Sequence, residues 1–190
     1  MTELESLEAF TSSELTALFE KTQNLDSDRA VAILKLIAER AYVDEDYEAM
    51  ANWNQKLAEF AEDNLHLNVA ADAQYLTGLA LFLQDDESAA LNHYQIAESM
   101  NAKLGRDSEL LDCLMNQMDC YECLEKYENI IRIGERALNV ARVGERFWVA
   151  GQTALKIAAA YHFLDEDGFS VYPRRLQHKT WIISIADHQS

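Results

Sequence analysis

The chain has very little proline and glycine: one proline and six glycines in 190 residues. Because these residues interrupt helices most strongly, their scarcity favours long, unbroken helices. Basic residues are also scarce, since 16 lysines and arginines stand against 33 acidic residues and give a formal net charge of -17. Binding a phosphate backbone needs clustered lysine and arginine, so this balance argues against a nucleic-acid partner. An acidic surface would instead prefer basic or neutral partners.

Long apolar runs are missing as well. No stretch approaches the roughly 20 apolar residues that a membrane-spanning helix needs, so we expect no membrane association. The first ten residues, MTELESLEAF, are acidic and lack the basic and then apolar regions of a secretory signal. We therefore expect a cytoplasmic protein.

Cysteine is rare, and the three cysteines present, Cys113, Cys120 and Cys123, fall within one predicted helix. An odd number of cysteines in one helix does not predict a disulfide framework. Cys120 and Cys123 form a C-x-x-C pair, but a tetrahedral zinc site needs four ligands and no second pair accompanies them. A thioredoxin-type site would need a βαβ setting. We interpret the cysteines as small buried apolar residues.

Signatures of catalysis are not recognisable. The histidines are scattered and form no H-E-x-x-H motif, and no glycine-rich phosphate loop occurs. Carboxylates are plentiful, but plentiful acids are not a catalytic pair without a pocket and perturbed pKa values. The sequence therefore predicts a protein that is not an enzyme and that needs no metal or cofactor.

What the sequence does contain is a pattern that returns at a nearly constant interval along the chain. Ala58, Ala97 and Ala137 fall at one repeat position in this register. The aligned stretches are AERAYVDEDYEAMANWNQKLAEFA, GLALFLQDDESAALNHYQIAESM, MDCYECLEKYENIIRIGERALNVA and AAAYHFLDEDGFSVY. Such self-similarity marks a solenoid, in which stacked units share one core that no unit can form alone.

Each repeat has the pattern of a helical hairpin. An N-terminal helix is predicted to begin near Thr11, which has the spacing of a capping box with Glu14. The hairpin turns are short and acidic, so we expect their carboxylates to cap the second helix. The predicted helices run over 27–43 with 45–63, 67–83 with 86–104, 107–124 with 126–142, and 145–164 with a shorter remainder.

The pattern resembles the tetratricopeptide repeat family. The clearest unit has Gly78 where two helices must approach closely, Ala90 twelve residues later, and then Tyr94 and Ala97. Small residues at such positions permit close helix contact, and the aromatic residue fills the space between hairpins.

The third unit departs from this pattern, since it carries Met118 for the small residue and Gly134 for the aromatic one. The repeats are also longer than the usual length of about 34 residues, so HEAT-like hairpins remain an alternative. The aromatic and alanine positions favour the tetratricopeptide interpretation.

The resemblance covers roughly residues 27–170 and implies an all-α, right-handed α-solenoid of about four hairpins. Residues 1–26 would form an N-terminal helix and cap, and residues 171–190 an atypical tail. This tail contains Pro173 at a position that would be interior to a helix, where proline costs about 3 kcal/mol. It is either a cap on the solenoid or the altered end of a longer array.

In tetratricopeptide proteins the first helix of each hairpin lines an inner groove. Carried over to this sequence, those positions give the following candidate partner-binding residues: Arg40, Asp72, Tyr75, Phe82, Asp112, Met115, Asp119, Glu122 and His162. Aromatic and methionine anchors flanked by carboxylates would suit a peptide or helix with apolar side chains and lysine or arginine.

The favoured function is a non-enzymatic protein–protein interaction scaffold that binds such a peptide or helix in an acidic concave groove. The alternative is an N-terminal sensory or regulatory array of a bacterial signalling protein, such as a diguanylate cyclase or a peptide-responsive regulator. Its output domain would lie outside this chain, which has neither a GGDEF-type motif nor a recognisable helix-turn-helix. A third hypothesis is self-association into a homodimer through an edge of the terminal hairpins.

Overall fold

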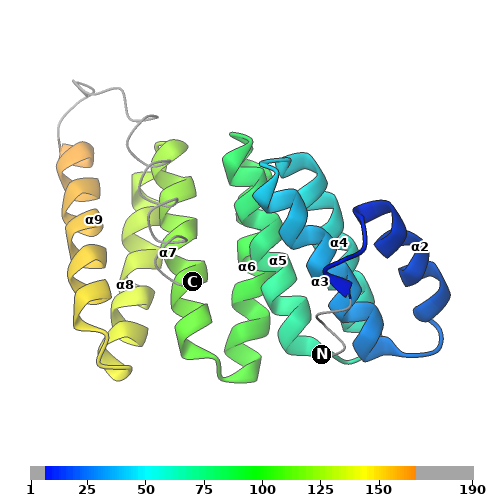
Figure 1. Cartoon of the computed structure of the whole chain (residues 1–190). Helices are drawn as coiled ribbons and strands as arrows, with labels where there is room; N and C mark the ends of the chain where they lie inside the picture. The colour runs from blue at the N-terminus through cyan, green and yellow to red at the C-terminus, as the bar shows by residue number, and fades with distance from the viewer. Residues whose placement is uncertain (1–6, 166–190) are drawn as a thin grey trace. The chain divides into compact units, whose positions relative to one another are not determined.

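The structure is a computed structural model that describes residues 7–165, and every element assigned in this part of the chain is an α-helix (Figure 1). The predicted all-α fold, with consecutive packed helices as in an α-solenoid, is confirmed. The helices are α2 (Ser12–Thr22), α3 (Ser27–Val43), α4 (Tyr47–Asp63), α5 (Leu67–Leu83), α6 (Glu87–Leu104), α7 (Asp107–Cys123), α8 (Tyr127–Val143) and α9 (Phe147–Asp165). The tail predicted from residue 171 onward lies outside the described residues.

Packing divides the chain into two units, Met1–Leu104 and Gly105–Ser190. In the first unit, each helix from α2 to α5 packs against the next helix along the chain. In the second unit, α7 packs against α8 and α8 packs against α9. The repeat pattern predicts one array and gives no sign of this division.

The helices begin at a fixed interval. From α3 to α9 their first residues are Ser27, Tyr47, Leu67, Glu87, Asp107, Tyr127 and Phe147, and the spacing between successive starts is the same throughout. Each repeat seen in the sequence is therefore two nearly equal half-repeats, each a helix and a short turn. The predicted helix bounds agree with the structure to within two residues.

The turns between these helices share one backbone geometry. After α3, the N–H of Asp46 donates to the carbonyl of Ala41 at 2.9 Å, and the N–H of Glu45 donates to that of Tyr42 at 3.0 Å. This pair of bonds closes a helix end only when one turn residue has a positive φ. The residues with that φ are Glu45 (57°), Leu65 (62°), Asp85 (63°), Gly105 (68°), Glu125 (56°) and Glu145 (54°).

Acidic side chains cap some of the helices at the other end. Asp26, Asp46 and Asp86 each accept a hydrogen bond from the backbone N–H three residues further on, at 2.9–3.0 Å. The expected capping by turn carboxylates is therefore confirmed for the first two hairpins. It is wrong for the third, because the N-cap of α8 is Lys126, which makes no side-chain cap hydrogen bond.

Helix α2 closes the N-terminal end of the first unit. Its predicted capping box is confirmed: Thr11 Oγ1 accepts from the N–H of Glu14 at 3.3 Å, and the Glu14 carboxylate accepts from the N–H of Thr11 at 2.8 Å. Leu15 and Phe19 are fully buried in the core. The Phe19 ring meets the Phe60 ring edge-on, with the ring centroids 5.5 Å apart.

Large and small residues are paired within each unit. In the first, a Cβ atom added to Gly78 would lie 2.9 Å from the ring of Tyr94. In the second, a Cβ atom added to Gly134 would lie 2.6 Å from Ile157 Cγ1 and 3.1 Å from Met118 Cε. The third repeat thus exchanges its large and small positions, which explains why it departs from the tetratricopeptide pattern without losing close packing.

The left-handed turns generate a stability prediction. Leu65 is exposed and has a positive φ, whereas Leu25 is an exposed turn leucine without one. We expect Leu65→Gly to stabilise the chain by about 0.5 kcal/mol, because relief of the left-handed strain exceeds the entropy that glycine adds to the unfolded chain. Urea unfolding of Leu65→Gly and of the control Leu25→Gly measures this. A lower midpoint for Leu65→Gly, or a gain in both variants, would contradict it.

The exchanged packing generates a second prediction. We expect Gly134→Ala to destabilise the chain by about 1–3 kcal/mol through overpacking, although alanine is the better helix former. Adding Ile157→Ala should recover part of this loss. The control is Gly151→Ala, where an added Cβ meets nothing within 4 Å and a gain of up to about 1 kcal/mol is expected. Strictly additive effects of Gly134→Ala and Ile157→Ala in urea unfolding would show that the two sites do not contact each other.

Candidate partner-binding surface

The nine candidate groove residues lie on helices of both units, and each unit carries its own share of them. In the first unit they are Arg40 on α3 and Asp72, Tyr75 and Phe82 on α5; in the second they are Asp112, Met115, Asp119 and Glu122 on α7 and His162 on α9.

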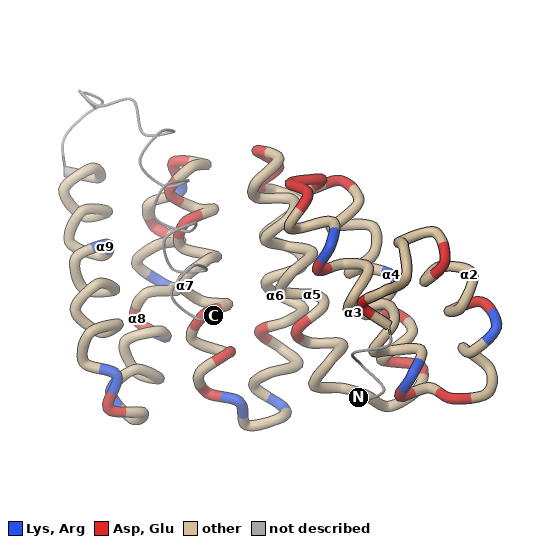
Figure 2. Tube along the Cα trace, viewed as in Figure 1, with Lys and Arg blue, Asp and Glu red and all other residues tan. Residues whose placement is uncertain are grey.

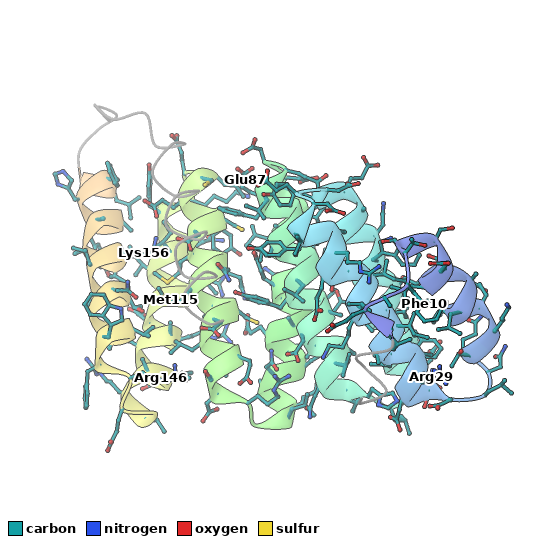
Figure 3. The ribbon with its side chains drawn as sticks, viewed as in Figure 1. Phe10, Arg29, Glu87, Met115, Arg146 and Lys156 are labelled. Carbon is teal, nitrogen blue, oxygen red and sulfur yellow. The ribbon has the colours of Figure 1, made fainter. Side chains whose placement is uncertain are left out.

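Arg40 holds the start of the described chain. Its guanidinium donates to the backbone carbonyl of Phe10, which Figure 3 labels, and to that of Glu8 at 2.9 Å. These bonds tie the segment before α2 to helix α3. The side chain that was expected to contact a partner is thus engaged in the packing of its own unit.

The α5 candidates differ in exposure. Phe82 is only 5% exposed and belongs to the packed interior, although the resemblance to the family placed it in the groove. Tyr75 is half-buried, and its ring packs against that of Tyr94 with centroids 5.5 Å apart. Asp72 is half-buried, so Asp72 and Tyr75 are the α5 candidates that are partly accessible at the surface.

Helix α7 presents the densest group of candidates. Asp112, Met115, Asp119 and Glu122 are spaced three or four residues apart, which places them along one face of the helix. Asp112 is exposed and the other three are half-buried. The structure therefore brings these four predicted residues together.

A lysine from α9 joins this face. Lys156 Nζ lies 2.6 Å from Asp119 Oδ1 and 2.9 Å from Glu122 Oε2. The exposed fractions of the three side chains are 24% for Lys156, 16% for Asp119 and 24% for Glu122. Ion pairs this sheltered are less screened by water and salt than surface pairs. Asp119 and Glu122 are thus held in place, and one of their two negative charges is balanced.

The two carboxylates also set the charge state of the lysine. Desolvation by itself lowers the pKa of Lys156, but the charges of Asp119 and Glu122 and their hydrogen bonds together raise the pKa above its ordinary value. A raised lysine pKa contributes stability that is complete below the unfolded pKa and is lost only as the pH rises through the folded one. The ion pair therefore persists throughout the neutral range.

A second basic residue approaches the other end of the α7 face. Arg146, in the turn before α9, donates a hydrogen bond to Ser108 Oγ. Asp112 keeps an exposed side, yet the surrounding protein desolvates its carboxyl enough to raise its pKa. The Arg146 charge opposes that rise and the Glu109 charge adds to it. The ionised form of Asp112 is therefore less well stabilised than in water.

Met115 lies between these charged groups. The hydroxyl of Thr153 on α9 lies 3.2 Å from Met115 Sδ and donates to the carbonyl of Val149 at 2.8 Å. Lys156 on α9, Met115 on α7 and Arg146 in the turn before α9, labelled in Figure 3, lie at successive levels of the second unit. The α7 face is thus a half-buried thioether with charged groups on either side.

His162 is exposed on α9. Its ring lies 5.8 Å from that of Phe163, which stacks on Tyr127 of α8 with centroids 5.2 Å apart.

Reasoning from the sequence missed Lys156 and Arg146. A signal was present for Lys156, because it is the only charged residue between Arg146 and Asp165 in an otherwise uncharged stretch. A lone charge in a packed helix is retained only if it reaches water or a partner. The acidic residues of the preceding hairpin were the nearest source of one.

One grouping in the described residues resembles a hydrolytic triad. His66 Nε2 lies 3.3 Å from Ser27 Oγ and 3.6 Å from Asp28 Oδ1. A proton relay needs the serine and the carboxylate on opposite ring nitrogens, and here both contact the same nitrogen. The geometry instead links the start of α5 to the start of α3.

The cysteines carry thiols without disulfides. Cys113 and Cys120 are buried, as expected for small core residues, and Cys123 is half-buried. Within residues 7–165, no three histidine, cysteine or acidic side chains are grouped closely enough to hold a metal ion. None of the helices described here combines the length and apolar character needed to cross a bilayer.

No protein-family model matches the chain, and no curated protein matches it. Among solved structures, the chain is similar to the crystal structure of BtubC (BKLC) from P. vanneervenii, with a TM-score of 0.58 and 14% sequence identity. The similarity covers 86% of this chain and 76% of that chain. At this identity the likeness shows a shared helical fold and nothing further.

The Lys156 ion pairs generate a third prediction. We expect Lys156→Met to destabilise the chain by about 1–3 kcal/mol, because two half-buried carboxylates lose their counter-charge. Urea unfolding at low and high salt measures the change. The control is Lys35→Met, which removes the same charge from an exposed site on α3 and should cost less than about 0.5 kcal/mol. Equal stability of the two variants would show that the ion pairs contribute little.

Proposed function

We propose that this chain is a non-enzymatic protein–protein interaction scaffold, and that the α7 face of its second unit binds a peptide or helix. The observation that carries the proposal is the fixed row of Asp112, Met115, Asp119 and Glu122, in which a polarisable thioether lies among carboxylates. Methionine adapts to varied apolar side chains, and carboxylates accept hydrogen bonds from lysine and arginine.

The contacts between α7 and α9 indicate which α7 carboxylate is most available to a basic side chain of a partner. Lys156 already partly compensates Asp119 and Glu122, whereas Asp112 is exposed and its ionised form is poorly stabilised. A basic side chain of the partner placed beside Asp112 would favour that ionised form and lower its pKa. The proposed partner therefore carries a lysine or arginine for Asp112 and an apolar side chain for Met115.

The scaffold itself supports the proposal. The face belongs to a 17-residue helix whose ends are fixed by short turns and which packs along α8. A surface that is already ordered loses little conformational entropy when it binds, so more of the contact energy contributes to affinity.

The packing of the second repeat supports kinship with the tetratricopeptide repeats as part of the proposal. Ala90, Tyr94 and Ala97 are all fully buried, and Gly78 lies against the Tyr94 ring. These are the roles that the family's small and aromatic positions play. We further propose a cytoplasmic location, in keeping with three cysteines that form no disulfide.

The test uses labelled peptides of defined composition, each about 15 residues long so that it can form four helical turns. One peptide carries leucine with lysine, one leucine with glutamate, and one serine with lysine. We expect only the leucine–lysine peptide to bind in fluorescence anisotropy. Asp112→Lys should weaken its binding by at least about tenfold, which corresponds to about 1.4 kcal/mol.

The matched control is Glu135→Lys, which makes the same change of charge at an exposed site on α8 of the same unit. It should leave the affinity unchanged at physiological salt. Equal weakening by Asp112→Lys and Glu135→Lys would show that the loss of affinity comes from the change in net charge alone. Binding of the leucine–glutamate peptide would contradict the proposal that an acidic face selects a basic partner. Circular dichroism confirms that each variant keeps its helices.

A further inference from the structure

Helix α9 has an exposed face built almost entirely of apolar residues. Phe147, Trp148, Leu155 and Tyr161 are between 50% and 75% exposed. On a helix with 3.6 residues per turn, these four positions fall within an arc of about 140°, which makes up one side of the helix. The small exposed residues on the same side are Gly151, Ala154 and Ala158, and the imidazole of His162 is exposed there as well.

This face is also neutral. The only charged residue between Arg146 and Asp165 is Lys156, and its ammonium is turned to Asp119 and Glu122 of α7. Figure 2 shows α9 as an uncharged trace with one basic position along its length. The whole chain has a net charge of -17, so a neutral apolar stripe of this length stands apart from its general composition.

We propose that this α9 face pairs with the same face of a second copy of the chain, as two antiparallel α9 helices related by a two-fold axis. Two copies carrying -17 each repel one another wherever their acidic surfaces would meet. The α9 face brings no like charges together. It is therefore a surface on which this acidic chain can meet itself.

The order of residues along α9 fits such a pairing. With the axis beside Ala154 and Leu155, Gly151 faces Ala158 of the partner subunit, and Trp148 lies at the level of Tyr161 of the partner subunit. Small residues near the axis let two helices approach to the roughly 8–10 Å at which helices pack. At each end of the contact the two aromatic residues lie on opposite edges of the face, so each can cover apolar surface of the other helix, and the arrangement is self-complementary.

The exposed area is large enough for a specific dimer. A buried aromatic side chain contributes about 150–250 Å², and each copy offers Phe147, Trp148 and Tyr161 in addition to Leu155. Allowing for the parts already covered, two copies would bury on the order of 1,000 Å², the lower bound for a specific interface. We therefore expect a reversible dimer with micromolar affinity, and this pairing does not depend on peptide binding at the α7 face.

Sedimentation velocity of the full 190-residue chain from low to high micromolar concentration tests the proposal. The wild type should shift from monomer to dimer over that range. Leu155→Glu should weaken the dimer by at least about tenfold, because it places two carboxylates beside the axis. Val43→Glu makes the same kind of change at an exposed site on α3 and should leave the dimer unaffected.

A cysteine variant tests the register. Ala154→Cys places two thiols beside the axis, so mild oxidation should link two chains faster than in Ala102→Cys, an equally simple change at an exposed site on α6. Three outcomes would each overturn the proposal: a chain that stays monomeric at every concentration, a dimer that survives Leu155→Glu, and equal cross-linking of the two cysteine variants. The first includes the case in which another segment of the same chain covers the face.

Discussion

The short left-handed turn that recurs between successive helices is the constraint on which the rest of this structure depends. Within each unit it ends a helix, reverses the chain and starts the next helix in a fixed rotational position, so that residues of successive hairpins come into contact. Hydrogen bonds therefore join one hairpin to the next within a unit: the Gln84 side chain donates to the backbone carbonyl of Tyr47, and Lys156 donates to Asp119. Because most of these turns use glutamate, aspartate or leucine where glycine would be unstrained, the packing of the helices must offset about 1 kcal/mol at each such turn.

Equivalent positions of successive repeats differ in residue type, but the combined side-chain volume that fills the space between their helices is kept. Tyr94 fills the space that Gly78 leaves, whereas one repeat later Gly134 leaves space for Met118 and Ile157. Interiors as dense as organic crystals tolerate such an exchange only when both members change together. The third repeat can therefore differ from the tetratricopeptide pattern in its residue types and still pack as a helical hairpin. Sequence similarity between repeats is thus lost before the fold is lost.

Periodicity in the sequence was sufficient to predict the helices, because the regular interval and the polar turns are local features. The resemblance to the tetratricopeptide repeats also pointed to Asp112, Met115, Asp119 and Glu122, which lie on one face of α7. It could not predict that Lys156 would reach this face, because that contact depends on how far a long side chain extends from a neighbouring helix. For the same reason, Arg40 on α3 looked accessible from its position in the repeat, although it binds backbone carbonyls before α2.

Two helices of this chain are apolar around most of their circumference, and their surroundings differ. Helix α5 packs against both α4 and α6 and is largely covered, whereas α9 packs against α8 and, within the described residues, leaves its opposite face open. A helix that is hydrophobic all round is ordinarily buried on all sides. The sequence of α9 is therefore typical of a helix that is covered on two sides. Helix α8 covers one side, and the α9 helix of a second copy would cover the other. Lys156 meanwhile turns its charge to α7, which leaves the open face neutral and the α7 carboxylates partly compensated. One lysine thus links the two surfaces: it moderates the acidity of the face proposed for peptides and keeps charge off the face proposed for a second copy.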